Sequence, residues 1–185
     1  MSLGLFGQSF TLNVANAAPA VALQGVDKDY VQQAQAIVAL SLLASRHAAA
    51  QLHVPKLQAF AALEIAEVES MWPVLQSIAT SAADSAPTPS EADLEKQLVP
   101  LGQTLLGKLR GTPAGIDLAR EYFLLEVNVH QQLLRLQEDY LKIGTNPHFL
   151  PIVKIIDMTI REHIALLGEI KTDTDSGKGT PRPGR

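Results

Sequence analysis

Five acidic or imidazole side chains fall on, or directly beside, the apolar faces of long helical patterns. They are Glu64, Glu67, Glu126, His130 and His163. Carboxylate oxygens and imidazole nitrogens suit iron, manganese and zinc, and helical bundles build metal sites from such side chains projecting inward from facing helices. These five residues are therefore the candidate metal ligands of the chain.

Helical periodicity turns both histidines toward the interior. At about 3.6 residues per turn, His163 falls between Ile160 and Leu167 on the apolar face, and Arg161 points the opposite way. Glu126 and His130 are four residues apart, so they are neighbours on one face of their helix. We expect both imidazoles to lie between packed helices.

Two interpretations of these inward polar groups are open. They could satisfy one another by hydrogen bonds, as buried polar groups must, or they could hold a metal ion. The Glu-x-x-His pattern of di-iron bundles is absent from the chain, and the first helix offers Ser41 where a carboxylate would be expected. The sequence therefore favours an internal polar network without a cofactor, and the alternative is an iron, manganese or zinc site.

Four long elements must position these side chains. The apolar spacing predicts helices over about 27–52, 55–81, 113–143 and 147–171. The segment 91–111 is also helical in pattern but is interrupted by Pro100 and Gly102. We therefore predict an all-α four-helix bundle with a broken helical crossover between the second and third long helices, which need not be antiparallel neighbours.

The length of 185 residues, 46% of them hydrophobic, suits one domain with flanking segments. We expect the bundle to span 27–171 and the tail at 172–185 to be disordered, because that tail has no apolar side chain to bury. Residues 1–26 form an N-terminal arm or a leader remnant. This segment ends in small residues but lacks a basic residue, which makes it a weak signal peptide.

Composition excludes several classes of function. The net charge of −4 gives no basic field for nucleic acid, and the absence of cysteine excludes disulfides and thiolate chemistry. No apolar run reaches the roughly 18 residues of a membrane-spanning helix. We also find no Gly-x-Ser-x-Gly elbow and no phosphate-binding glycine loop.

The N-terminal arm is the candidate partner-binding segment. It carries four large apolar side chains, namely Leu5, Phe6, Phe10 and Leu12. Exposed apolar clusters of this kind mark contact surfaces, so we expect the arm to pack on its own bundle, on a second copy or on a protein partner. The alternative is that the arm is a cleaved or disordered leader.

Four stretches, in the order DKDYVQQA, PKLQAFA, YFLLEVNVH and TIREHIALL, resemble the ferritin-like domain-of-unknown-function family 4142, whose members are commonly labelled outer-membrane or exported bacterial proteins. The resemblance covers about residues 27–171 and implies a ferritin-like bundle. It makes His130 and His163 the counterparts of two family histidines. Ser41 and the pair Glu67-Val68 replace a family glutamate and an Asp-His pair, which implies a reduced ligand set.

The first functional expectation is a non-enzymatic helical-bundle protein of the bacterial envelope or secreted space, which acts through protein contacts or assembly. The resemblance supplies the location, periplasmic or exported, and no established reaction. The alternative is a metal-binding ferritin-like oxidoreductase or metal-storage protein. In that case the glutamates would hold the ion and the histidines would complete its coordination.

Overall fold

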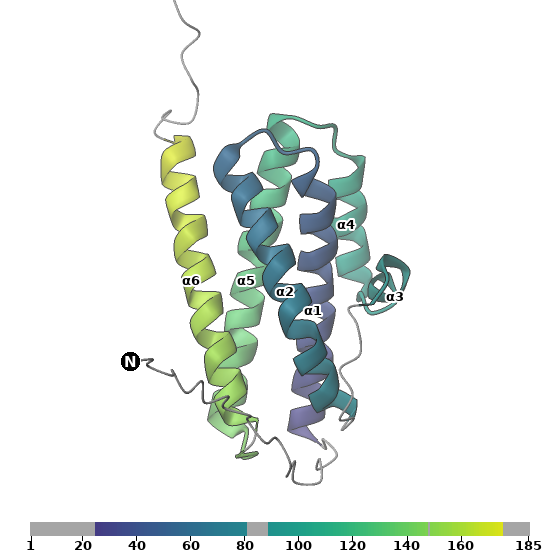
Figure 1. Ribbon diagram of the computed structural model, residues 1–185, viewed down its shortest axis with the longest axis vertical. Coiled ribbons are helices and arrows are strands. Elements are labelled where there is room, and N and C mark those ends of the chain that lie inside the picture. Colours follow the sequence, from purple (N-terminus) through teal and green to yellow (C-terminus); the bar gives the residue numbers. More distant parts are fainter. Residues whose placement is uncertain (1–24, 81–88, 148, 176–185) are drawn as a thin grey trace, which may run out of the picture.

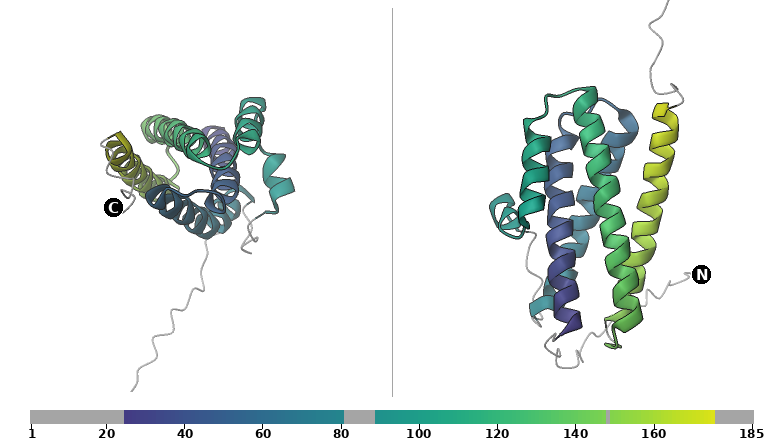
Figure 2. Two further views of the ribbon diagram at one scale, coloured as in Figure 1. Left: turned by 90° about the horizontal axis from the view of Figure 1, so that it is seen from above. Right: turned by 180° about the vertical axis from the view of Figure 1, so that it is seen from behind.

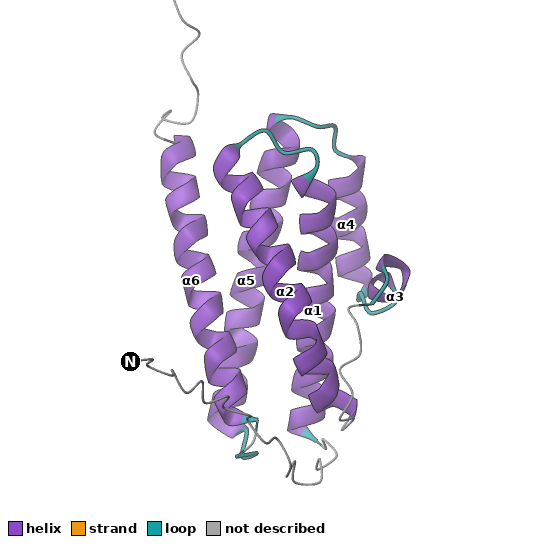
Figure 3. Ribbon diagram, in the orientation of Figure 1, coloured by secondary structure: helices purple, strands orange, loops and turns teal. Residues whose placement is uncertain are grey.

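The computed structural model describes residues 25–80, 89–147 and 149–175, and within these ranges every regular element is a helix (Figures 1 and 3). The helices are α1 (Val26–Ala49), α2 (Pro55–Thr80), α3 (Glu91–Glu95), α4 (Pro100–Gly111), α5 (Ile116–Ile143) and α6 (Leu150–Asp175). The all-α prediction is confirmed. None of these helices combines the length and apolar character needed to cross a bilayer.

The four long helices α1, α2, α5 and α6 lie side by side, and the short α3 and α4 pack on the outside of α1 (Figure 2). Helix α1 contacts both α2 and α5, and α5 contacts α6. Helix α2 runs opposite to α1, α5 runs in the same direction as α2, and α6 returns in the direction of α1 (Figure 1). The interrupted segment predicted between the second and third long helices corresponds to α3 and α4.

Two helix starts lie later than the sequence predicted. Helix α5 begins at Ile116 rather than near 113, because Gly115, with φ +134°, still holds the chain outside the helical region. Helix α6 begins at Leu150 rather than near 147. The Asn146 side chain accepts from the backbone N–H of Phe149 at 3.3 Å in the turn that precedes α6.

The predicted domain limits need one correction. Helix α6 continues to Asp175, so residues 172–175, expected to be disordered, are helical. Helix α6 therefore continues one turn beyond the end of the apolar pattern. Residues 176–185 of the tail and the four large apolar side chains of the N-terminal arm, Leu5, Phe6, Phe10 and Leu12, lie outside the described residues.

Helix α1 occupies the centre of the molecule because its side chains are small. Ala39, Ala44 and Ala48 are fully buried, and α1 contacts the long helices α2 and α5 as well as α3 and α4. A helix with alanine on several faces lets its neighbours approach closely, and interiors are packed nearly as densely as organic crystals. The core is therefore arranged around this helix.

Three aromatic rings close one end of the long-helix group. The rings of Tyr30 and Tyr140 lie 4.6 Å apart between centroids, and Phe149 lies 5.3 Å from each of them. The Tyr140 hydroxyl donates to Asp27 Oδ1 at 2.5 Å. These contacts join the start of α1 to the end of α5 and the start of α6.

We predict that Leu43→Ala lowers the free energy of unfolding by about 2–5 kcal/mol, because it opens a cavity in close-packed core. Leu43 is 1% exposed on α1, whereas Leu124, the matched control on α5, is 53% exposed. Leu124→Ala should change stability by less than about 0.5 kcal/mol. Urea denaturation of both variants measures the difference, and equal losses would contradict the central position of α1.

Candidate functional site

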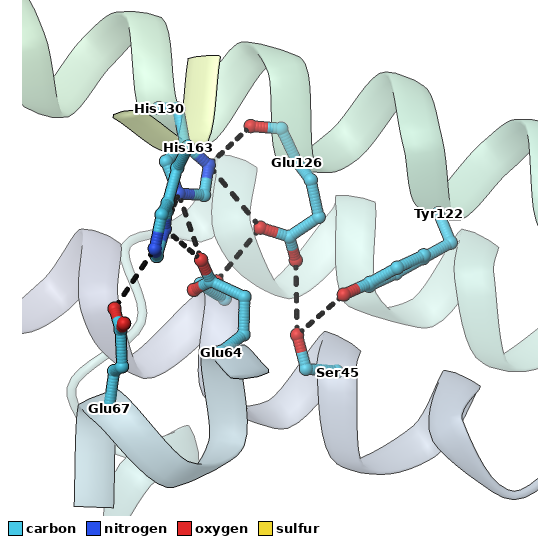
Figure 4. Close-up of polar contacts among 8 residues, drawn as sticks. Ser45, Glu64, Glu67, Tyr122, Glu126, His130 and His163 are labelled. Carbon is cyan, nitrogen blue, oxygen red and sulfur yellow. Dashed lines mark hydrogen bonds and ion pairs between the residues drawn. The ribbon is translucent and has the colours of Figure 1, made fainter. Parts of the chain in front are cut away.

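Three donor atoms from three helices converge in the interior (Figure 4). Glu64 Oε1 of α2 lies 2.5 Å from His163 Nδ1 of α6 and 3.0 Å from His130 Nε2 of α5, and the two nitrogens are 3.1 Å apart. With separations this short, a single point lies about 2.0–2.2 Å from all three atoms, the length of zinc–nitrogen and zinc–oxygen bonds. The buried Glu64, His130 and His163 group could hold a metal ion.

The helical phase predicted for α6 is confirmed. His163 is 5% exposed and faces α2 and α5, and the side chain of Arg161 is 51% exposed. Arg161 pairs on the surface with Asp157 and Glu138, each at 2.9 Å. One turn of α6 thus presents an imidazole to the interior and a guanidinium to solvent.

A backbone carbonyl fixes the orientation of His130. Its Nδ1 donates to the carbonyl oxygen of Glu126 at 2.8 Å, and a carbonyl oxygen can only accept. The proton of a neutral imidazole is therefore on Nδ1, and the Nε2 lone pair points at Glu64 and His163. Histidines that bind metals in proteins are held by this kind of outer hydrogen bond.

Two further side chains orient the other donor atoms. Glu67 Oε2 lies 2.9 Å from His163 Nε2, on the side of the ring away from Glu64. Ser41 Oγ lies 2.9 Å from Glu64 Oε2, the carboxylate oxygen that does not face the imidazoles. Each donor side chain of the group thus has a polar partner on the side away from the other two donor atoms.

A polar chain extends from Glu64 into α1 and α5. Ser41 Oγ also lies 2.8 Å from Glu126 Oε2, and Ser45 Oγ lies 3.4 Å from Glu126 Oε1 and 2.8 Å from the Tyr122 hydroxyl (Figure 4). A serine hydroxyl has a single proton, so Ser41 cannot donate to both carboxyl groups. The consistent arrangement has a protonated Glu126 that donates to Ser41, which in turn donates to Glu64.

The pKa shifts of the two glutamates agree with this arrangement. Complete burial, and then the negative charge of Glu64, raise the pKa of Glu126 well above its usual value, and bonds to Ser41 and Ser45 only partly oppose this. Burial alone would also raise the pKa of Glu64. Hydrogen bonds and electrostatic attraction from His130 and His163 instead lower that pKa to about 2.

Two carboxyl groups favour the charged form of His163. Burial lowers its pKa, but the hydrogen bond and charge of Glu64, followed by the charge of Glu67, more than offset burial, and the net pKa is raised. Its ring therefore lies between two carboxyl groups that favour its protonated form, and a positive charge there stabilises a buried, ionised Glu64.

The five residues predicted from the sequence are separated by the structure into two sets. Glu64, His130 and His163 bring donor atoms together, and Glu67 contacts the outer nitrogen of His163. Glu126 is not part of the donor group, because its carboxyl points to Ser41 and Ser45 of α1. It approaches His130 chiefly through its backbone carbonyl.

Ser45 and Gln137 were not predicted to be polar members of the interior, yet both are completely buried. A signal was available for each of them. Ser45 is one turn after Ser41, and Gln137 is two turns after His130, so each shares a helix face with a residue already assigned to the interior.

No family model, no curated protein sequence and no solved structure gives a match to this chain.

The pKa of Glu126 predicts how stability depends on pH. Because this pKa is higher in the folded than in the unfolded state, its contribution is complete below about pH 4.5 and decreases as pH rises toward the folded value. We expect Glu126→Gln, which stays neutral, to gain stability relative to the wild type between pH 5 and pH 8. Thermal unfolding of chelator-treated protein across that range measures the gain.

Glu169→Gln is the control, since Glu169 is exposed on α6. Its stability should follow that of the wild type at every pH. Parallel curves for Glu126→Gln and the wild type would contradict a protonated Glu126.

Proposed function

We propose that the protein binds one divalent transition-metal ion, of the iron, manganese or zinc type, through Glu64, His130 and His163. The observation that carries the proposal is the mutual approach of Glu64 Oε1, His130 Nε2 and His163 Nδ1, with no separation above 3.1 Å. Two histidines and one carboxylate form a set that proteins use for zinc and for non-haem iron.

Protons satisfy this triangle of atoms poorly as long as Glu64 is ionised. With Glu64 ionised, its oxygen accepts only, so each imidazole nitrogen must carry a proton to bond it. Both nitrogens then carry protons and face each other at 3.1 Å as two donors. If either proton is removed, a nitrogen lone pair faces the carboxylate oxygen, and the two repel each other.

A cation at the common point satisfies all three lone pairs at once. Glu64, His130 and His163 would hold it, and the outer contacts of Glu67, Ser41 and the Glu126 carbonyl would orient them. Three protein ligands leave coordination positions open, and a bound ion would supply Lewis acidity there.

For the fold we propose a ferritin-like four-helix bundle. The directions of the four long helices support this, since α2 and α5 run the same way and are linked through α3 and α4 (Figure 1). One long crossover of this kind is typical of ferritin-like proteins. The proposed site, between α2, α5 and α6, lies where such bundles place their metals.

A non-enzymatic helical-bundle protein that acts through protein contacts or assembly was the first functional expectation from the sequence, with the N-terminal arm at 1–26 as its candidate contact segment. Residues 1–24 of that arm lie outside the described residues. Metal binding, the alternative expectation, is the function that the geometry of the described residues supports best.

We predict that iron(II), manganese(II) or zinc binds to the chelator-treated protein in a one-to-one ratio and raises its melting temperature. An ion at 100 times its Kd stabilises a folded protein by about 2.7 kcal/mol. For a chain of this size that corresponds to roughly 5–10 °C. Calorimetry and elemental analysis of the desalted protein measure stabilisation and stoichiometry, with iron handled without oxygen.

His130→Ala should abolish both effects, whereas His53→Ala should retain them, because His53 is exposed in the connection between α1 and α2. Circular dichroism confirms that the His130 variant is helical, and His163→Gln provides a second test of the ligand set. If none of the three ions binds in a one-to-one ratio, or if His130→Ala binds as tightly as the wild type, the proposal is wrong.

Glu67→Gln should weaken metal binding about 10–100-fold without changing its stoichiometry. The amide would no longer balance the charge on the outer nitrogen of His163, and outer partners have effects of that size. Glu69→Gln is the control, since Glu69 pairs with Arg46 at the surface. Competition with a chromophoric chelator measures the affinities, and equal weakening in both variants would contradict the role of Glu67.

A further inference from the structure

One side of the four-helix group is open. The backbone of α1 lies close to those of α2 and α5, and that of α5 lies close to α6, whereas α2 and α6 approach each other much less closely. Contacts of Glu64 and Glu67 with His163 join α2 to α6 near the middle of both helices. Toward the start of α2 and the end of α6, a groove of about 270 Å³ separates them.

The lining of this groove is mostly apolar. Lys56 and Glu169 belong to it and have opposite charges, so the groove carries no net charge. The other side chains that line it are Ala59, Phe60, Leu63, Leu166 and Ile170. An apolar groove of this kind is typical of a contact surface. An uncharged apolar segment fits it, because a charged group would lose water there without gaining a partner.

The groove lies beside the metal-donor group. The ring of Phe60 lies 5.7 Å from the ring of His130 and 5.6 Å from that of His163, measured between centroids. Phe60 also lines the groove, so the groove and the donor group share this side chain. A segment in the groove would cover Phe60 and keep water away from the two imidazoles.

The N-terminal arm has a composition that matches the groove. Residues 1–26 contain no Asp, Glu, Lys or Arg, and the first charged side chain of the sequence is Asp27. The large apolar side chains of the segment 5–12 are Leu5, Phe6, Phe10 and Leu12. Packing this segment in the groove would remove apolar surface of both from water, which is favourable.

The arm is also long enough to reach the groove. It joins α1 at the end of the molecule where α6 begins. Because Ser41 of α1 bonds to Glu64 of α2, Phe60 lies at a level roughly 30 Å along α1 from Val26. The chain from Phe10 to Val26 can span about 50 Å when extended.

Covalent attachment favours this arm over the arm of a second copy. A segment tethered through a short connection acts at an effective concentration in the millimolar range. The same segment on another molecule is present only at the concentration of the protein itself. The occupant that the groove would meet first is therefore the arm of its own chain.

We propose that residues 5–12 pack in the groove between α2 and α6 of the same chain, and so shield the metal-donor group from solvent. Phe6 and Phe10 make the contact with the five apolar side chains of the groove. The packing itself involves only the arm and the groove. It can therefore be tested on metal-free protein.

A nitroxide attached to Ser9→Cys tests this packing in the full chain, because the sequence has no cysteine that would also react. The protein is chelator-treated, so that no paramagnetic ion contributes. We expect the methyl NMR signals of Leu63 and Leu166 to lose most of their intensity relative to the sample with reduced nitroxide. The signal of Leu101 should be retained, since Leu101 is exposed on α4, on the outside of α1.

A mixing experiment distinguishes the chain's own arm from that of a second copy. Spin-labelled protein without NMR isotopes is mixed with isotope-labelled protein without a nitroxide, so that only contacts between molecules are detected. We expect no loss of intensity in the mixture. Loss at Leu63 and Leu166 in the mixture, or no loss at these residues in either sample, would overturn the proposal.

Ala59→Glu tests the groove side of the contact. Ala59 is exposed and lines the groove, so the substitution leaves the core intact and places a charge against the arm. It should restore the Leu63 and Leu166 signals in the spin-labelled chain. Ala165→Glu, at an exposed position of α6 outside the groove lining, should leave them weakened. Equal intensities in the two variants would contradict the assignment of this groove.

Phe6→Asp combined with Phe10→Asp tests the arm side without changing any residue of the helices. This variant should also restore the signals of the groove. Asn13→Asp combined with Asn16→Asp adds the same charge at polar positions of the arm and should not. If the signals stay weak after both phenylalanines are replaced, the arm does not bind through them and the proposal is wrong.

This proposal and the metal site can fail separately. If the nitroxide weakens the groove signals but no ion binds, only the metal site is wrong. If an ion binds in a one-to-one ratio but the groove signals do not change, only the packing of the arm is wrong.

Discussion

An ionised carboxylate buried between two imidazoles is the constraint on which the interior depends. Glu64 is 4% exposed, and a buried charge without partners is strongly destabilising. Its partners come from three other helices: His130 from α5, His163 from α6 and Ser41 from α1. The relative positions of the four long helices are therefore coupled to the position of one side chain.

The central helix α1 makes this arrangement possible by being narrow and slightly polar. Its buried alanines bring α2 and α5 close, and at that short range two serines are long enough to reach carboxyl groups on both neighbours. A glutamate at position 41 would place a third carboxyl beside Glu64 and Glu126. Serine instead carries one proton between them. The pKa shifts at the two positions are opposite because burial and the charge of Glu64 raise the pKa of Glu126, whereas His130 and His163 overcome burial and lower the pKa of Glu64.

The apolar spacing along the chain predicted features that depend on a single helix. It did not predict contacts between helices, because those depend on how the helices are rotated relative to each other. The inward phase of His163 follows from the apolar spacing of α6 alone. Glu64 and Glu126 both lie on apolar rows and look equivalent in the sequence, but only the packing of α2 against α5 and α6 decides which carboxyl meets both imidazoles. The starts of α5 and α6 differed because local backbone features delay them: Gly115 holds the chain outside the helical region, and Asn146 accepts from the N–H of Phe149 in the turn before α6.

The orientation of the three donor side chains does not require an ion. Each donor side chain has a second polar contact on the side away from the other donor atoms. The Glu126 carbonyl contacts His130, Ser41 contacts Glu64, and Glu67 contacts His163. The three donor atoms therefore converge without a bound ion. In a tetrahedral site with bonds of about 2.0 Å, ligand atoms are roughly 3.3 Å apart, close to two of the three separations here. The third, 2.5 Å between Glu64 Oε1 and His163 Nδ1, is the length of a contact that contains a proton. Entry of the proposed ion would replace that proton and widen the contact by less than an ångström, so binding would require little movement of the donor side chains.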